Sequence, residues 1–175
     1  LYNRENMKTL IYASTFVIIV AATAMSQNPS SESWGCEQKD YKCQLDGRMK
    51  ALQADPRNPE NYYNLGIVFQ RSGNHVQAVE TFSMYIAIPG IKSELLADGY
   101  NMRGISQRAL RRPDQAHADY SNAIELNPKN PSFVVNRGNA NIDLKKPDAA
   151  LADYAAALHI DPQFALAYSN RGHYF

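Results

Sequence analysis

The chain has 175 residues, of which 45% are hydrophobic and 20% are charged, and its formal net charge is +1 at pH 7. This composition is typical of an ordered globular protein and excludes a disordered chain. The balanced charge, without a basic patch or an acidic tail, argues against nucleic-acid binding and favours a protein or peptide partner.

The first 26 residues differ in kind from the rest of the chain. Met7 is the expected start of translation, and Lys8 precedes an apolar run over residues 10–22. This run is shorter than the roughly 20 residues that span a bilayer, and small residues follow it at the spacing that a signal peptidase needs. We therefore predict a signal peptide over residues 1–26 and a mature protein that is periplasmic or extracellular and not in a membrane. The alternative is a membrane anchor at residues 10–25.

Residues 27–40 form a predicted linker, and the two cysteines of the chain, Cys36 and Cys43, lie in it or just after it. In an exported protein an even number of cysteines makes a disulfide plausible. Residues seven apart on a helix are about 10.5 Å apart, whereas the Cα atoms of a disulfide lie within about 7 Å. A bond therefore requires Cys36 to lie outside the helix, which Gly35 permits. The alternative is two unreactive thiols that pack as small apolar groups.

Helix signals recur through the rest of the chain. Pro113 and Pro147 are each followed by an aspartate. Proline is well tolerated at the first position of a helix, and an acidic residue in the first turn interacts favourably with the helix dipole. We predict an all-α fold. The predicted helices are 41–54, 60–72 paired with 75–88, 93–110 paired with 113–126, 132–144 paired with 147–160, and a last helix that begins near 164.

Glycines recur at a nearly constant interval, at positions 66, 104, 138 and 172. An alanine follows each of the first three after 12 residues, and an aromatic residue follows after 16. Glycine destabilises a helix interior by about 1 kcal/mol relative to alanine, so its recurrence indicates places without room for a side chain. We predict that the first helix of each pair packs closely on the second there. The predicted packing residues are Gly66, Ala78, Phe82, Gly104, Ala116, Tyr120, Gly138, Ala150, Tyr154 and Gly172.

This pattern resembles the tetratricopeptide repeat (TPR) family over about residues 44–175. The resemblance implies an α-solenoid of helix-turn-helix repeats that forms a right-handed superhelix with a concave groove. Because the chain ends inside a first helix, we expect it to be the N-terminal part of a longer protein. The expected division of the TPR array, residues 41–175, is a half repeat at 41–58, full repeats at 59–92, 93–130 and 131–164, and a partial repeat at 165–175.

Two positions depart from the family pattern. Gln107 and Asn141 stand three residues after their glycines, where a large apolar residue is expected. We expect these two helix pairs to be weaker or differently packed. Arginines at 103, 137 and 171 precede three of the glycines, and we expect them to bury their stems with their charged heads near solvent or near carboxylates such as Asp119 and Asp153. Glu80, Asp119 and Asp153 are expected on solvated helix faces.

In the resembled family the first helix of each repeat lines the groove. Asparagines at 64, 136 and 170 recur two residues before a glycine, where they either hold the backbone of a partner or bond neighbouring helices. The lysine and asparagine clamp by which one family branch binds C-terminal carboxylates is incomplete, because Val135 occupies a lysine position. The predicted peptide-groove residues are Tyr63, Ile67, Gln70, Arg71, Asn101, Ile105, Arg108, Val135, Asn139, Ile142 and His173.

Catalytic patterns are absent from the sequence. The four histidines fall at different repeat positions, and there is no nucleophile triad, phosphate loop or metal-binding cysteine pattern. We predict a protein without enzymatic activity, cofactor or metal, which serves as an exported interaction scaffold that binds a peptide or helix in the concave groove. The alternatives are the recognition arm of a larger enzyme whose catalytic domain lies C-terminal to this fragment, and self-association through the last helix.

Overall fold

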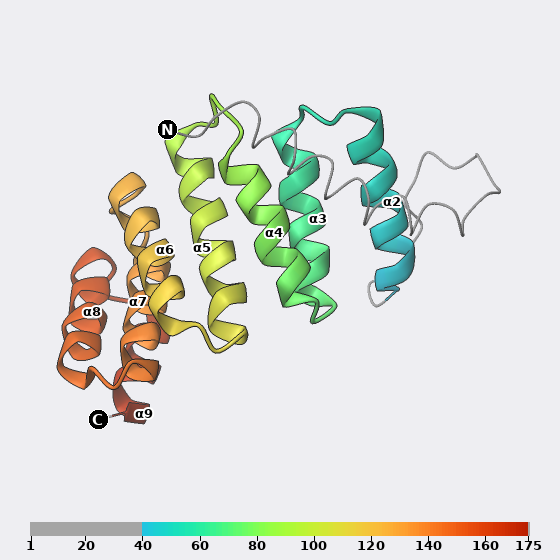
Figure 1. Cartoon of the computed structure of the whole chain (residues 1–175). Coiled ribbons are helices and arrows are strands. Elements are labelled where there is room, and N and C mark those ends of the chain that lie inside the picture. The colour runs from blue at the N-terminus through green and yellow to red at the C-terminus, as the bar shows by residue number, and fades with distance from the viewer. Residues whose placement is uncertain (1–39, 175) are drawn as a thin grey trace. The chain divides into compact units, whose positions relative to one another are not determined.

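The computed structural model describes residues 40–174, and every regular element in this range is an α-helix. Each helix packs against the next one in chain order (Figure 1). The predicted signal peptide lies outside the described residues. Within residues 40–174, no helix combines the length and the apolar character needed to cross a membrane. The helices are α2 Tyr41–Ala54, α3 Pro59–Arg71, α4 His75–Ile86, α5 Ser93–Ala109, α6 Pro113–Leu126, α7 Pro131–Asp143, α8 Pro147–Ile160 and α9 Ala165–Tyr174.

Local sequence signals place the ends of these helices. Proline occupies the first turn of α3, α6, α7 and α8, where its missing N–H has no helical partner to lose. Asn58 caps α3 by accepting a hydrogen bond from the backbone N–H of Glu60 at 3.0 Å. Asn130 caps α7 in the same way, from the N–H of Ser132. The predicted helix ranges are confirmed to within two residues.

The turns inside the three helix pairs share one backbone geometry. Gly73 ends the first turn with φ of +81°, and Arg111 and Lys145 hold the same place with φ of 58° and 61°. In each turn the N–H of the next residue bonds a carbonyl five residues earlier, which closes the C-terminus of the first helix. A residue with a side chain costs roughly 1–2 kcal/mol in this conformation, whereas glycine adopts it freely. These bonds join Asn74 to Phe69, Arg112 to Gln107 and Lys146 to Asn141.

Close contact between the paired helices occurs at the recurrent glycines. A Cβ atom built on Gly66, Gly104 or Gly138 would overlap the aromatic ring that follows 16 residues later. The rings and the matching alanines, Ala78, Ala116 and Ala150, are almost entirely buried. A side chain at these glycines would therefore force a packed ring to move. The distances from such a Cβ to the nearest ring carbon are 2.7 Å for Gly66 and Phe82, 2.8 Å for Gly104 and Tyr120, and 2.6 Å for Gly138 and Tyr154.

Gly172 makes no such contact among the described residues, and its packing role stays a prediction. No heavy atom lies within 4 Å of a Cβ built there, because no second helix follows α9 in this part of the chain. Nearby Leu166 and Tyr168 are also exposed. A different glycine, Gly99 in α5, was not among the predicted packing residues, yet a Cβ there would lie 2.5 Å from the ring of Tyr85 in α4. The signal that could have identified it is its place inside a predicted helix, where glycine is unfavourable.

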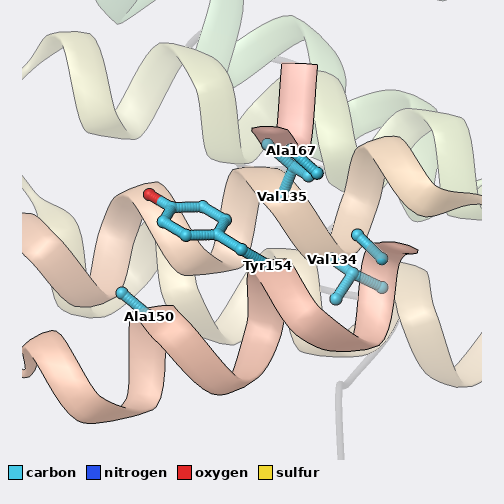
Figure 2. Close-up of a cluster of buried hydrophobic side chains, with 6 residues drawn as sticks. Val134, Val135, Ala150, Tyr154 and Ala167 are labelled. Carbon is cyan, nitrogen blue, oxygen red and sulfur yellow. The ribbon is translucent and has the colours of Figure 1, made fainter. Parts of the chain in front are cut away.

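The last three helices share a buried cluster (Figure 2). Val134 and Val135 come from α7, Tyr154 comes from α8 and Ala167 comes from α9, and each is at most 3% exposed. In Figure 2, Val135 lies beside Ala167, which joins one helix pair to the next first helix. Apolar burial of this kind stabilises the stack by about 25 cal/mol for each Å² removed from water.

Candidate binding face on the first helices

The first helices of the pairs, α3, α5, α7 and α9, form one side of the array, which we name the first-helix face. α5 contacts both α3 and α7, and α7 contacts α9. The second helices α4, α6 and α8 make no such contacts with one another among the described residues. The first helices therefore lie closer together than the second helices do, and they present a continuous surface.

Polar side chains link α3 to α5 and α5 to α7 on this face. Gln70 Nε2 of α3 donates to the backbone O of Met102 at 3.1 Å and to Ser106 Oγ at 3.0 Å. Asn136 Nδ2 of α7 donates to Asn101 Oδ1 of α5 at 2.8 Å. Each of these bonds satisfies a half-buried or buried amide within the array, which would otherwise cost free energy. The face is therefore held together without a ligand.

Further polar contacts link α5 to α7 and α7 to α9. Arg108 Nε of α5 lies 2.6 Å from Asp143 Oδ2 of α7 in a half-exposed ion pair. Asn139 Oδ1 accepts from the Tyr154 hydroxyl at 2.7 Å and from Asn170 Nδ2 at 2.9 Å. Two of the three recurrent asparagines, Asn136 and Asn170, thus bond neighbouring helices rather than standing free. Asn64, the third, makes no side-chain hydrogen bond within residues 40–174.

Two predicted groove residues are not on an accessible surface. Val135 is fully buried, and Asn101 is 6% exposed. The prediction that they line the groove is wrong, because Val135 of α7 packs in the cluster that includes Ala167 of α9, and Asn101 of α5 accepts a hydrogen bond from the amide of Asn136. Ile105 and Ile142 are half-buried and pack against buried clusters, so only part of each side chain faces outward.

The remaining predicted groove residues keep accessible surface. Ile67 is half-exposed and belongs to no buried cluster of the described residues. Arg71 and His173 are exposed. The ring of Tyr63 is half-buried and makes an edge contact with Phe82, at 5.9 Å between centroids. The face therefore combines apolar surface at Tyr63 and Ile67 with exposed polar side chains at Arg71 and His173.

The arginine before Gly104 is part of a buried ion pair. Arg103 Nη2 lies 2.7 Å from Asp119 Oδ1, and Arg103 Nη1 donates to Ser83 Oγ at 3.0 Å. Asp119 is 3% exposed, so its predicted place on a solvated face is wrong, whereas the predicted approach of Arg103 to this carboxylate is confirmed. Burial raises the pKa of the Asp119 carboxyl against the opposing effect of Arg103, while the hydrogen bond to Asp119 raises the pKa of Arg103. The pair is attractive, but the burial of its carboxylate offsets much of that attraction.

A second pair repeats this arrangement with one difference. Arg137 Nη2 lies 2.6 Å from Asp153 Oδ1, and Asp153 is also buried rather than solvated as predicted. Asn141 Nδ2 donates to Asp153 Oδ2 at 2.9 Å, so this departure from the family pattern gives a differently packed pair. Gln107, at the matching place in α5, is 8% exposed and its Oε1 atom has no hydrogen-bond partner. The exposed Arg171 instead lies 5.5 Å from the ring centroid of Tyr168.

An acidic group lies near the first-helix face between α3 and α5. Burial raises the pKa of the Asp98 carboxyl, which has no cationic partner among the described residues. Burial is the main reason that the pKa values of Tyr63 and Tyr85 are raised, and the nearby charge of Asp98 adds to it; the pKa of Tyr85 reaches about 12. Asp98 was not among the predicted site residues, because no residue type recurs at its place in the repeats.

A cleft of about 380 Å³ lies where the α5–α6 and α7–α8 turns meet the end of α9. Three of its side chains are cationic and one is acidic. Only Arg108 and Ile142 of this group were predicted site residues. The repeated basic pairs before Pro113 and Pro147 were the available signal. The lining residues are Arg108, Arg111, Pro113, Ile142, Asp143, Lys145 and Tyr174.

Two further predictions concern metal binding and the two cysteines. Residues 40–174 contain no group of three or more histidines, cysteines, aspartates or glutamates placed to hold a metal ion. Cys43 lies in the first turn of α2, and its backbone N–H donates to Asp40 Oδ1 at 3.0 Å. Cys36 lies outside the described residues, so the disulfide stays a prediction.

Comparison with known proteins identifies the repeat. Two family models, both described as tetratricopeptide repeat, match residues 49–80 and 101–163, together more than half of the chain. A curated relative, the UDP-N-acetylglucosamine--peptide N-acetylglucosaminyltransferase of Giardia intestinalis, is 30% identical over 86 residues. That match covers 49% of this chain and 6% of the relative, so the chain spans only a small part of the relative's length.

Solved structures share the fold. A crystal structure of MamA matches with a TM-score of 0.65 and 23% identity, over 76% of this chain and 80% of that one. The first TPR of Spaghetti (RPAP3), bound to HSP90 peptide SRMEEVD, matches with a TM-score of 0.61 and 18% identity. This match covers 69% of the present chain and 92% of that one. At these identities the likeness extends to the arrangement of the helices.

Proposed function

Because this chain belongs to the tetratricopeptide repeat family, we propose that it is a protein-interaction scaffold that binds a peptide or helical segment. The binding surface is the first-helix face, on the concave side that the family fold implies. A solved structure of the same fold holds a peptide, which supports this class of partner. Function in this fold depends on the side chains of the face, since many unrelated functions share the fold.

The observation that carries the proposal is the set of hydrogen bonds between first helices. Gln70, Asn136 and Asn170 each bond the neighbouring first helix. A face that is already held in place loses little conformational entropy when a partner binds. The accessible apolar surface at Tyr63 and Ile67 then supplies contact area, while charged groups set the direction of the bound segment.

A pair of matched substitutions tests this proposal. Peptides are selected by display against the full chain, and the affinity of the best binder is measured by fluorescence anisotropy. Ile67→Asp places a charge on the first-helix face, and we expect affinity to fall about tenfold or more, because a buried charge without a partner is costly. Val76→Asp places the same charge on the exposed surface of α4 and should leave affinity unchanged.

The two variants also define the result that would count against the proposal. Circular dichroism checks that both keep the helical content of the parent chain. Equal affinity of the parent and the Ile67→Asp variant, with helicity intact, would remove the first-helix face as the binding surface. Equal loss in both variants would assign binding to the whole surface instead.

The match to the glycosyltransferase, which covers 6% of that relative, favours a second function. In that case the helix array is the recognition arm of a larger enzyme, and binding on the first-helix face selects the protein substrate. The full-length reading frame distinguishes the two functions, because the enzyme requires a catalytic domain beyond residue 175.

We also propose that residues 1–26 direct export of the chain to the periplasm or the cell exterior. The support is the charged start, apolar run and small residues of this segment. Mass spectrometry of the exported protein should find a new N-terminus near residue 26, whereas an intact N-terminus in a membrane fraction would favour the anchor at residues 10–25.

A further inference from the structure

The cleft between the α5–α6 turn, the α7–α8 turn and the end of α9 has an uneven distribution of charge. Arg108 is matched by Asp143, with 2.6 Å between Nε and Oδ2. Arg111 and Lys145 are exposed and have no acidic partner within residues 40–174. The cleft therefore presents two unmatched positive charges, about one helix pair apart, on opposite turns.

The backbone of these two residues makes the placement unusual. Arg111 and Lys145 have φ of 58° and 61°, in the left-handed region that favours glycine. The matching turn in the first helix pair uses Gly73, with φ of +81° and open space around it. Two of the three turns thus keep a cationic side chain where glycine would fold with less strain, and both side chains line the same cleft. Backbone strain that folding does not require is a reason to look for function.

The other walls of the cleft indicate what kind of anion it suits. Ile142 and Tyr174 add apolar surface, and the ring of Tyr174 is 43% exposed. A carboxylate on a hydrocarbon stem matches this combination, since its charge can meet the cations while its methylene groups cover the apolar wall. The chain as a whole has a net charge of +1, which does not suit a nucleic acid backbone.

We propose that this cleft binds the carboxylate side chains of an acidic peptide segment, through Arg111 and Lys145. The inference rests on the proposed peptide-binding function and adds the chemistry of its ligand. Arg108 and Asp143 also line the cleft, and their ion pair links α5 to α7. The acidic side chains enter at the turn end of the first-helix face, which fixes one end of the bound segment.

The test uses the double variant Arg111→Gly with Lys145→Gly in the full chain. The probe is a fluorescein-labelled peptide of glutamates interspersed with leucines, and its glutamine counterpart is the uncharged reference. We expect the double variant to bind the glutamate peptide about tenfold more weakly, and the parent affinity to fall as salt rises. Because glycine relieves the strained backbone, the variant should melt at the same temperature as the parent or higher.

A matched control separates the cleft from the general charge of the protein. Arg112→Gln with Lys146→Gln removes two positive charges as well, from residues next in the chain that do not line the cleft. This control should bind the glutamate peptide like the parent. Equal weakening in both double variants, or equal binding of the glutamate and glutamine peptides, would overturn the proposal. Displacement of the bound peptide by inorganic phosphate at low millimolar concentration would assign the cleft to small anions and also overturn it.

Failure here is distinguishable from failure of the proposed function. If the glutamate peptide does not bind the parent chain, the assignment of an acidic ligand is wrong. The displayed peptides and the Ile67→Asp variant still report on the first-helix face, because Ile67 does not line this cleft.

Discussion

The α3–α4 pair and the two later pairs, α5–α6 and α7–α8, fill the same place between their helices with different chemistry. The later pairs carry a half-buried arginine one position before the glycine and a buried aspartate fifteen positions after it. The α3–α4 pair has Leu65 and Thr81 there, and both are buried. Thr81 Oγ1 donates within its own helix, to the backbone O of Gln77 at 2.7 Å. The crossing of the helices is therefore compatible with either an apolar pair or an ion pair.

The same contrast extends to neighbouring positions. Three residues after the glycine, α3 has Phe69 where the later helices have Gln107 and Asn141, and the first turn has Gly73 where the later turns have cations. What does not differ is the contact of glycine with an aromatic ring. The contact of glycine with the ring is thus common to all three pairs, whereas the groups beside it differ.

The largest expected effect comes from removing one partner of the buried ion pair. Asp119→Ala leaves the guanidinium of Arg103, whose side chain is 22% exposed, without its carboxylate. We expect the free energy of unfolding to fall by about 2–3 kcal/mol, because an unpaired buried charge is costly. Thr81→Ala at the matching position of α3–α4 should cost only about 1 kcal/mol. Urea unfolding followed by circular dichroism measures both.

Converting the later pair into the earlier one is the control for that comparison. Arg103→Leu together with Asp119→Thr installs the side chains of α3–α4 in α5–α6. Because both charges leave together, the double variant should stay within about 1 kcal/mol of the parent or be more stable. A double variant as unstable as Asp119→Ala would mean that the ion pair is necessary for packing, and the two regions would not be equivalent.

A smaller effect is expected where the two regions agree. Gly66→Ala and Gly104→Ala should each lower the free energy of unfolding by about 1–2 kcal/mol, since overlap with a buried ring outweighs the gain in helix propensity. The losses should be similar, because both glycines meet a ring at nearly the same distance. Gly172→Ala has no ring to meet and should gain up to about 1 kcal/mol. Thermal melts of the three variants measure these changes. Clearly unequal losses at Gly66 and Gly104 would show that the residues beside the glycine also affect its contact with the ring.

The smallest expected effect is on the pH dependence of stability, through Asp98 of α5, the helix that follows the α3–α4 pair. Burial raises the pKa of Asp98 in the folded chain above its unfolded value, about 3.9, so the folded state binds this proton more tightly. Stability from this group is therefore greatest below pH 4 and is lost as pH rises through the folded pKa. Asp98→Asn removes the titration, so it should melt higher than the parent at pH 7 and equally at pH 3.5. A parent that is the more stable of the two at pH 7 would show that the charged form is favoured in the fold.

Much of the fold could be predicted from residues close together in the chain. Prolines and asparagine caps place the helix ends, since capping involves residues two or three positions apart. The interval between Gly104 and Tyr120 predicts their contact, because two antiparallel helices joined by a short turn bring those positions face to face. These features depend on local chemistry and on the helical repeat of 3.6 residues.

The candidate site depended on contacts between residues more than 30 positions apart. A rotation of α7 by one residue, about 100°, exchanges the buried place of Val135 for the accessible place of a neighbour, and no local signal determines that rotation. Nor does any local signal bring Arg111 and Lys145 to one cleft with Tyr174, since this requires the stacking of successive helix pairs. The sequence alone thus determined the helices and their pairing, while only the tertiary structure determined which side chains remain free to bind a partner, because exposure depends on how each helix is rotated against its neighbours.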